Sequence, residues 1–183
     1  MESLTDHFLI AMPAMGDPNF NQTVTLIFEH DESKAMGLVI NRPTELTTRS
    51  VFGQLALEIS DSRLGDQAVL QGGPVRPEWG FVLHLEGDYK STIQTPAGIR
   101  VSTSQDILAA MAAGEGPYPV ALALGCAAWG AGQLENELVA NAWLSAPANP
   151  EVLFETPFEQ RWSAAAGLLG VDITQLSAYA GHA

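Results

Sequence analysis

The single cysteine of this chain, Cys126, lies where a strand-like apolar run gives way to a helix-like segment. A thiol at the start of a helix can have its pKa lowered and can then act as a nucleophile. The surrounding residues Gly125-Cys126-Ala127-Ala128-Trp129, however, lack the glycines two positions either side that shape a nucleophile elbow. We therefore expect a small packed thiol at Cys126 and assign no catalytic residue.

Three histidines, His7, His30 and His84, stand at the starts or ends of strand-like runs and could converge in the fold. Imidazole is a common zinc ligand, but zinc sites often take their histidines from short spacings of the His-x-x-x-His type. Here three separate strands would have to bring distant residues together. We predict no metal site and no cofactor, and we expect hydrogen-bonded histidines or a polar rim to a pocket.

The pattern Gly72-Gly73-Pro74 invites a phosphate-binding interpretation, because glycine-rich loops can cradle phosphate groups. Pro74 has no backbone N–H to donate, no Lys-Ser/Thr pair follows, and no helix is expected to open there. The interpretation favoured instead is a tight turn at which one stretch of backbone approaches another closely.

A helix is predicted over residues 132–143, and two of its faces differ in character. Leu134 and Leu138 belong to an apolar stripe that should face the core. The neighbouring polar stripe consists of Gln133, Glu137 and Asn141. This stripe could line a ligand cleft, or it could serve a structural hydrogen-bond network. In either case Glu137 should be partly buried, and its carboxylate must then be paired or hydrogen-bonded.

The elements that position these residues are predicted from apolar, β-branched and aromatic runs between turn signals. Strands are expected at 8–12, 23–28, 36–40, 68–70, 81–84, 91–95, 99–101, 120–124 and 152–154, with the second and third forming a hairpin. Further helices are expected after Ser50, after the capping-box pattern 103–106, and across 158–169. Together these indicate one α+β domain over residues 1–183, with helices mainly in the C-terminal half.

The charge balance limits the partners of the chain, because 21 Asp and Glu face 8 Lys and Arg for a formal net charge of −13. The cations are scattered singly, whereas binding to a phosphate backbone needs them clustered. We expect no direct nucleic acid binding and no attachment to an anionic membrane. The lone cysteine and an acidic amino terminus with no signal-peptide pattern predict a cytoplasmic protein.

Four segments, in order and nearly spanning the chain, together resemble the YqgE/AlgH family of bacterial proteins. They are 7–13 with Asp17 and Phe20; Glu29-His30 with 35–43; Gly72-Gly73-Pro74-Val75 with 80–84; and Gly125, Trp129, 132–135, Glu137, Asn141 and Trp143 with the later Arg161-Trp162 and Gly181-His182-Ala183.

This resemblance implies a cytoplasmic bacterial protein whose α+β fold has a curled, mixed or mostly antiparallel sheet tending to a barrel. It also implies a regulatory role. The net negative charge of the chain speaks against direct DNA contact in that role. The family supplies no accepted catalytic residues to carry over. Its members often have tyrosine where this chain has Cys126, which speaks against a shared catalytic thiol.

The leading functional prediction is a binding or regulatory module for an unknown small molecule or protein partner. Its cleft is expected near the Gly72-Gly73-Pro74 turn and the 129–141 segment, and the candidate binding residues are His30, Asn41, Gly72, Gly73, His84, Trp129, Gln133, Glu137 and Asn141. One alternative is an enzyme, a hydrolase or redox protein, that uses His30 or His84 with Glu137. The other is a transcriptional regulator, disfavoured as a direct DNA binder.

Overall fold

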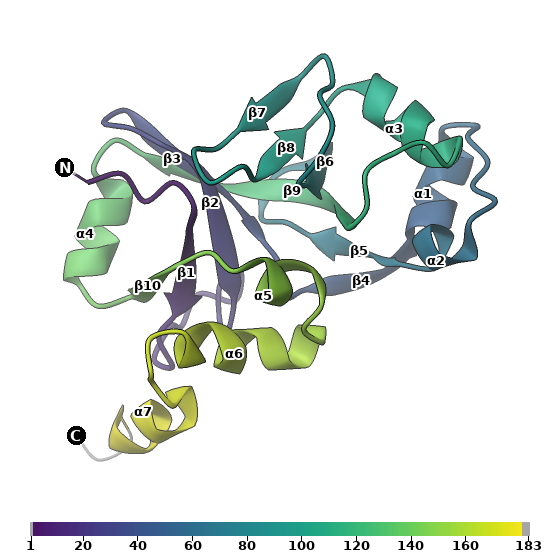
Figure 1. The fold of residues 1–183 in the computed structure, drawn as a ribbon. Helices are drawn as coiled ribbons and strands as arrows, with labels where there is room; N and C mark the ends of the chain where they lie inside the picture. The colour runs from purple at the N-terminus through teal and green to yellow at the C-terminus, as the bar shows by residue number, and fades with distance from the viewer. Residues whose placement is uncertain (1, 181–183) are drawn as a thin grey trace.

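A curled ten-stranded sheet forms the body of the molecule, and helices pack around it (Figure 1). The computed structural model describes residues 2–180, so Gly181-His182-Ala183 of the family-like pattern lie outside the described residues. Within residues 2–180 the strands are β1 (His7–Ala11), β2 (Val24–His30), β3 (Lys34–Val39), β4 (Pro43–Thr47), β5 (Ala68–Gln71), β6 (Val75–His84), β7 (Thr92–Gln94), β8 (Arg100–Ser102), β9 (Val120–Gly130) and β10 (Trp143–Pro147).

The helices described in the same residues are mostly short and come late in the chain. They are α1 (Thr48–Gln54), α2 (Ser62–Gly65), α3 (Gln105–Ala112), α4 (Gln133–Val139), α5 (Pro150–Phe154), the 3-10 helix η1 (Phe158–Gln160), α6 (Arg161–Gly167) and α7 (Ile173–Ala180). Their concentration in the C-terminal half agrees with the sequence prediction. No helix in residues 2–180 combines the length and apolar character needed to span a bilayer.

Strand β9 connects the two halves of the sheet. Its second half pairs antiparallel with β3, its first half pairs antiparallel with β6, and β5 joins it in parallel. On the far side of β3 lie β2, β1 and β10, each antiparallel to its neighbour. Since β5–β9 is the one parallel pairing among the described strands, the prediction of a curled, mostly antiparallel sheet in an α+β fold is confirmed.

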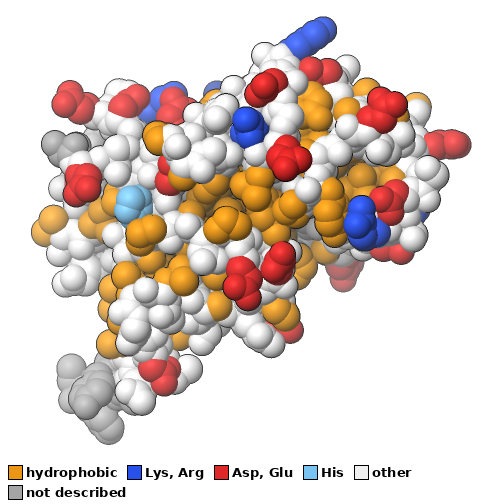
Figure 2. All heavy atoms as spheres, in the orientation of Figure 1, with side chains coloured by type: hydrophobic (Ala, Val, Ile, Leu, Met, Phe, Trp, Pro, Cys, Tyr) orange, Lys and Arg blue, Asp and Glu red, His pale blue; other side chains and the backbone are white. Residues whose placement is uncertain are grey.

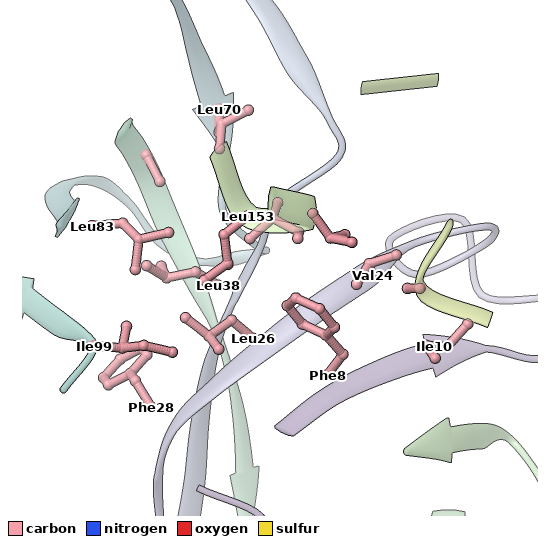
Figure 3. Packing of buried hydrophobic residues seen from close by; sticks show 14 of the residues in the cluster. Phe8, Ile10, Val24, Leu26, Phe28, Leu38, Leu70, Leu83, Ile99 and Leu153 are labelled. Atoms are coloured by element: carbon pink, nitrogen blue, oxygen red, sulfur yellow. The ribbon is translucent and has the colours of Figure 1, made fainter. Parts of the chain in front are cut away.

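Three clusters of buried side chains make up the core. The first joins the sheet to α5 and α6, and Figure 3 shows how Phe8, Leu26, Leu38 and Leu153 meet within it. The second lies beneath α1 and α3, around Phe52, Val82, Ile107, Met111 and Leu122. The third surrounds α4 and contains Leu9, Ile27, Ala127, Trp129, Leu134 and Trp143.

The prediction of a strand at 152–154 is wrong, because these residues belong to the helix α5. Asn149 caps the helix by accepting a hydrogen bond from the Val152 N–H at 3.2 Å, and Pro150 occupies the first helical turn. Both signals are typical of a helix start. A run of three apolar residues is compatible with both a buried strand and one face of a short helix. The capping residue Asn149 favours the helix here.

The helix predicted over 132–143 is also too long, because α4 ends at Val139 and Trp143 already begins β10. Asn141 adopts a left-handed φ of 58°. The Asn141 N–H donates to the Leu138 carbonyl and the Ala142 N–H donates to the Glu137 carbonyl, each at 3.0 Å. These two bonds form a Schellman motif, which ends the helix.

Candidate functional site

Glu137 stands at the centre of a hydrogen-bonded aromatic cluster on α4. Its Oε2 accepts hydrogen bonds from the indole Nε1 of Trp129 at 2.9 Å and from that of Trp143 at 2.8 Å. Its Oε1 accepts from the Gln133 side-chain amide at 3.2 Å. Phe20 stacks on Trp129 with ring centroids 6.0 Å apart and meets Trp143 edge-on at 5.5 Å. The carboxylate thus ties α4 to β9 and β10, which leaves few of its lone pairs for a ligand.

The predicted polar stripe divides at the end of α4. Gln133 stays with Glu137, and its amide oxygen also accepts from the Gly130 N–H at 3.1 Å. Asn141 is exposed and belongs to the turn that ends the helix, so it does not share the face that carries Glu137. The structure therefore brings together Trp129, Gln133 and Glu137, and it separates Asn141 from them.

His30 belongs to a neighbouring but distinct contact. Its Nε2 lies 2.7 Å from Oε1 of Glu135, and its Nδ1 accepts the Leu4 N–H at 2.8 Å. The acceptor role of Nδ1 means that the ring carries its proton on Nε2 and donates it to Glu135. The His30 side chain is only 3% exposed. The pKa of Glu135 is lowered by its own backbone N–H at the start of α4 and next by His30.

His84 is sealed in the interior between β6 and β8. Its Nδ1 donates to the Glu86 carbonyl and its Nε2 accepts from the Ser102 hydroxyl, both at 2.7 Å. Burial lowers the pKa of His84. A serine beside a histidine resembles part of a hydrolase triad, but His84 and Ser102 are both 0% exposed and no substrate could reach them. Neither His84 nor His30 forms a hydrogen bond or ion pair with Glu137 in the described residues, so the His–Glu137 pair of the enzyme alternative is not formed.

Gly72 and Gly73 lie buried at the crossing of two backbones. A Cβ on Gly72 would collide with the Gly125 carbonyl, and a Cβ on Gly73 would collide with the backbone of Cys126. This close approach is the role that the tight-turn interpretation assigns to the glycines. Cys126 itself faces the core from the middle of β9, not from a strand–helix junction as predicted, and burial raises the pKa of its thiol.

Asn41 holds the end of β3 against the start of β2. Its Oδ1 accepts the Val24 N–H and its Nδ2 donates to the Gln22 carbonyl, both at 2.9 Å. The nine predicted site residues therefore fall into separate places rather than around one cleft. Each has a structural partner or a close backbone contact in the described part of the chain, and ligand binding by any of them stays a prediction.

The larger opening lies elsewhere, in an apolar groove of about 620 Å³ between α1 and α3. Its floor includes Leu122 and Leu124 of β9, and one wall includes Leu108 of α3. The other wall follows α1, which ends in a second Schellman motif: Ala56 has a φ of 57° and the Leu57 N–H donates to the Phe52 carbonyl at 2.9 Å. That turn folds Leu57 back so that it also lines the groove.

Sequence reasoning missed this groove because its walls carry no reactive groups. Glu78, in the irregular stretch of β6 between Val75 and Gly80, is the one charged residue that lines it, and Thr103 supplies the one hydroxyl. None of the nine predicted site residues lines it. One signal was available: the four apolar residues Val51, Phe52, Leu55 and Leu57 lie in the short helix α1 and the turn after it, and one of them, Leu55, is 52% exposed.

A second, smaller cleft of about 260 Å³ lies between α5 and the start of β9. Apolar residues such as Leu70, Leu153 and Phe158 line it together with the guanidinium-bearing Arg161. None of the predicted site residues lines this cleft either. In the described part of the chain no group of three or more His, Cys, Asp or Glu side chains is placed to hold a metal ion.

Comparison with known proteins agrees with the fold described above. A family model described as AlgH-like matches residues 8–174. A UPF0301 protein of Xanthomonas campestris pv. campestris is 51% identical over 181 residues, which cover 98% of this chain and 96% of that protein. A UPF0301 protein of Xanthomonas axonopodis pv. citri matches to the same extent.

Two solved structures share the architecture. The solution structure of the AlgH protein from Pseudomonas aeruginosa superposes with a TM-score of 0.81 at 52% identity, covering 99% of this chain and 96% of that one. A crystal structure of a Corynebacterium diphtheriae protein gives a TM-score of 0.76 at 19% identity, covering 97% and 93%, and it shows the fold alone. The family model and the close relatives confirm the resemblance read from the sequence, and the chain belongs to the YqgE/AlgH, or AlgH-like, family.

Proposed function

We propose that this chain is a binding module and that its site is the apolar groove between α1 and α3. The observation that carries the proposal is the groove itself, whose volume of about 620 Å³ is that of typical binding sites and whose walls are mostly aliphatic. Glu78 is the only titratable residue in its lining, so the lining holds no acid–base pair that could activate a nucleophile such as the Thr103 hydroxyl. Binding therefore suits the groove better than catalysis.

The occupant that fits best is an amphipathic helix of a partner protein. Apolar surface continues from the groove onto its rim, where Leu46 is 38% and Leu55 is 52% exposed. A small molecule seated on the floor would leave these rim leucines in water, whereas the apolar face of a helix would cover them. Helix-in-groove recognition uses anchors at i, i+3, i+4 and i+7 in this way.

Charge adds a requirement on that partner. The chain carries a net charge of −13, and the charged residue in the groove wall is the acid Glu78. A partner helix with lysine or arginine beside its apolar face would be attracted, and an acidic helix would be repelled. We infer that the partner segment is cationic as well as amphipathic.

Titration with two synthetic peptides tests this proposal. One peptide carries leucines at i, i+3, i+4 and i+7 with lysines on its flanks, and its twin carries glutamates in place of the lysines. Fluorescence anisotropy should show saturable binding of the lysine peptide and at least about tenfold weaker binding of its twin. Equal binding of both peptides, or of neither, would contradict the proposal.

Two leucines give a matched pair of variants for the same titration. Leu55 and Leu168 are both exposed C-cap residues of short helices, and only Leu55 lines the groove. Leu55→Lys should weaken binding of the lysine peptide at least about tenfold, because it removes apolar contact and adds a like charge. Leu168→Lys should leave binding unchanged, and equal loss in both variants would place the peptide elsewhere.

Any regulatory role would then act through protein contact and not through DNA. We further propose that the protein is cytoplasmic, because its one cysteine is a free thiol, as is usual in a reducing compartment. Four of its eight cations already face carboxylates, in the pairs Lys34–Glu29, Arg49–Asp66, Arg63–Asp61 and Arg100–Asp88. We expect no measurable affinity for duplex DNA at physiological salt. A salt-sensitive micromolar complex in a mobility-shift titration would contradict this expectation.

A further inference from the structure

Arg161, the first residue of α6, is a buried cation held by backbone carbonyls. It is 4% exposed. Its Nε donates to the Thr156 carbonyl and its Nη1 donates to the Ile40 carbonyl, both at 2.7 Å. The Phe158 ring lies under the guanidinium, with 4.5 Å from Cζ to the ring centroid. These contacts fix the guanidinium in one orientation.

No carboxylate in residues 2–180 lies within ion-pair distance of this guanidinium. Buried arginines are normally paired, because taking an unpaired charge out of water is costly. Burial lowers the pKa of Arg161 to about 10, and desolvation alone causes the shift, so the side chain is still charged at neutral pH. Two carbonyls satisfy two of the five N–H donors of the guanidinium.

The guanidinium keeps donors that no protein group in residues 2–180 accepts, and Arg161 is a lining residue of the smaller cleft. The second amino nitrogen, Nη2, has no protein acceptor among the described residues, and it is not one of the side-chain atoms sealed from solvent without a partner. Arg161 lines the cleft of about 260 Å³, whose other walls are largely apolar. Figure 2 shows hydrophobic side chains gathered on this face, over α5, β5 and the first residues of β9.

We propose that this cleft binds a small organic monoanion, a carboxylate on a compact apolar body, with Arg161 as its counter-ion. The free edge of the guanidinium can donate to the carboxylate, and arginine forms its strongest hydrogen bonds with such oxygens. Phe154 and Phe158, which are half-buried, would contact the apolar body. The proposal concerns a site separate from the groove and does not depend on it.

The charges around the cleft favour a monoanion over a phosphate. Arg161 is the only cation that lines the cleft, and the other charged lining residue is the acid Glu155. Glu155 is exposed and forms no ion pair in the described residues. A dianion would meet one positive charge, this nearby carboxylate and a chain of net charge −13. A single carboxylate matches the single guanidinium.

The test uses 4-fluorobenzoate as the probe and 4-fluorobenzamide as its neutral control, with binding followed by fluorine NMR. The full chain should bind the benzoate saturably, and the benzamide should bind at least about tenfold more weakly, because it lacks the charge that Arg161 complements. Equal affinity for both probes, or no saturable binding of the benzoate, would overturn the proposal.

Three variants locate the probe in the cleft. Arg161→Lys keeps the charge and loses the planar fork, so it should weaken benzoate binding at least about tenfold. Because Arg161→Lys also disturbs the hydrogen bonds to the Thr156 and Ile40 carbonyls, Gln67→Glu provides an independent test. Gln67 lines the same cleft and is half-buried, and its replacement by glutamate adds a repelling carboxylate with little change of shape. Gln67→Glu should also weaken benzoate binding, and unchanged affinity would overturn the proposal.

Glu155→Gln distinguishes a ligand site from an internal ion pair. If the cleft is open to anions, this variant should bind benzoate as well as or more tightly than the unaltered chain. If benzoate binds only after Glu155→Gln, the Glu155 carboxylate is the natural partner of Arg161 in solution, and the proposal is wrong. Circular dichroism of each variant verifies that it is folded.

Discussion

The region around α4 and the groove between α1 and α3 differ in almost every physical respect. Around α4, a glutamate, a glutamine and two tryptophans satisfy one another through hydrogen bonds, and neither the groove nor the smaller cleft described above lies there. In the groove the walls are aliphatic and a large space is open. Polar residues that meet each other stabilise a fold, whereas apolar residues that nothing covers are the ones available to a partner.

The largest effect that this comparison predicts is on stability at α4. Leu134 is 1% exposed, so Leu134→Ala should lower the free energy of unfolding by about 2–5 kcal/mol. Leu138 is only half-buried, so Leu138→Ala should lower the free energy of unfolding by less than half as much. Val139, which is 84% exposed, gives the control, since Val139→Ala should change little. Urea unfolding measures all three, and an equal loss at Leu138 and Leu134 would mean that α4 is rotated.

Next in size is the loss of the Glu137 carboxylate. Glu137→Ala leaves two indole N–H groups without their acceptor and should cost about 2–3 kcal/mol, whereas Glu137→Gln keeps an oxygen for both and should cost about 1 kcal/mol. Neither change should alter binding of the lysine peptide. Thermal unfolding and anisotropy measured on the same samples separate the two effects. A folded Glu137→Gln protein that loses peptide binding would move the site to α4.

A smaller effect should appear as a pH dependence that arises from His84. Burial lowers its pKa below the ordinary 6.5, so the unfolded chain takes up this proton at a higher pH than the folded chain does. The contribution of neutral His84 to the free energy of unfolding is therefore fully present above pH 6.5, and it is lost as the pH falls from 6.5 towards the lowered pKa. His84→Gln should show a shallower loss over that window in thermal melts. Parallel curves for the two proteins would show that His84 is not responsible.

The smallest effect on stability is expected in the groove wall. Leu55→Lys should change the free energy of unfolding by no more than about 0.5 kcal/mol, because the side chain is half in solvent. Its effect on peptide binding should still be large, which is the reverse of the pattern expected at Glu137. A strongly destabilised Leu55→Lys protein would mean that Leu55 packs within the fold and that the groove is part of the core.

The sequence predicted much of the fold because many strands are apolar runs between turn signals, and β2 is also rich in β-branched and aromatic residues. It misplaced α5 and the end of α4, where a single capping residue, Asn149 or Asn141, outweighs the apolar pattern. Cys126 and Trp129 were placed beyond the strand because Gly125 looked like its end, yet β9 continues through Gly125 to Gly130.

The candidate site was harder to predict, for a physical reason. Residue types that can do chemistry, such as His30, His84 and Glu137, are also those that must find hydrogen-bond partners when buried, and here they found them in the protein. The sequence does show that Glu137 needs partners, but not that the partners are two indoles. The groove depends on the distance between α1 and α3, which no local pattern encodes.

Chemical-shift mapping of the lysine peptide on the labelled protein tests most directly whether the groove, and not the α4 cluster, is the binding site. Amide signals of α1, α3 and the part of β6 around Glu78 should move with added peptide, while the indole N–H signals of Trp129 and Trp143 stay in place. Movement of those two indole signals with no change in α1 and α3 would contradict the assignment and return the site to α4.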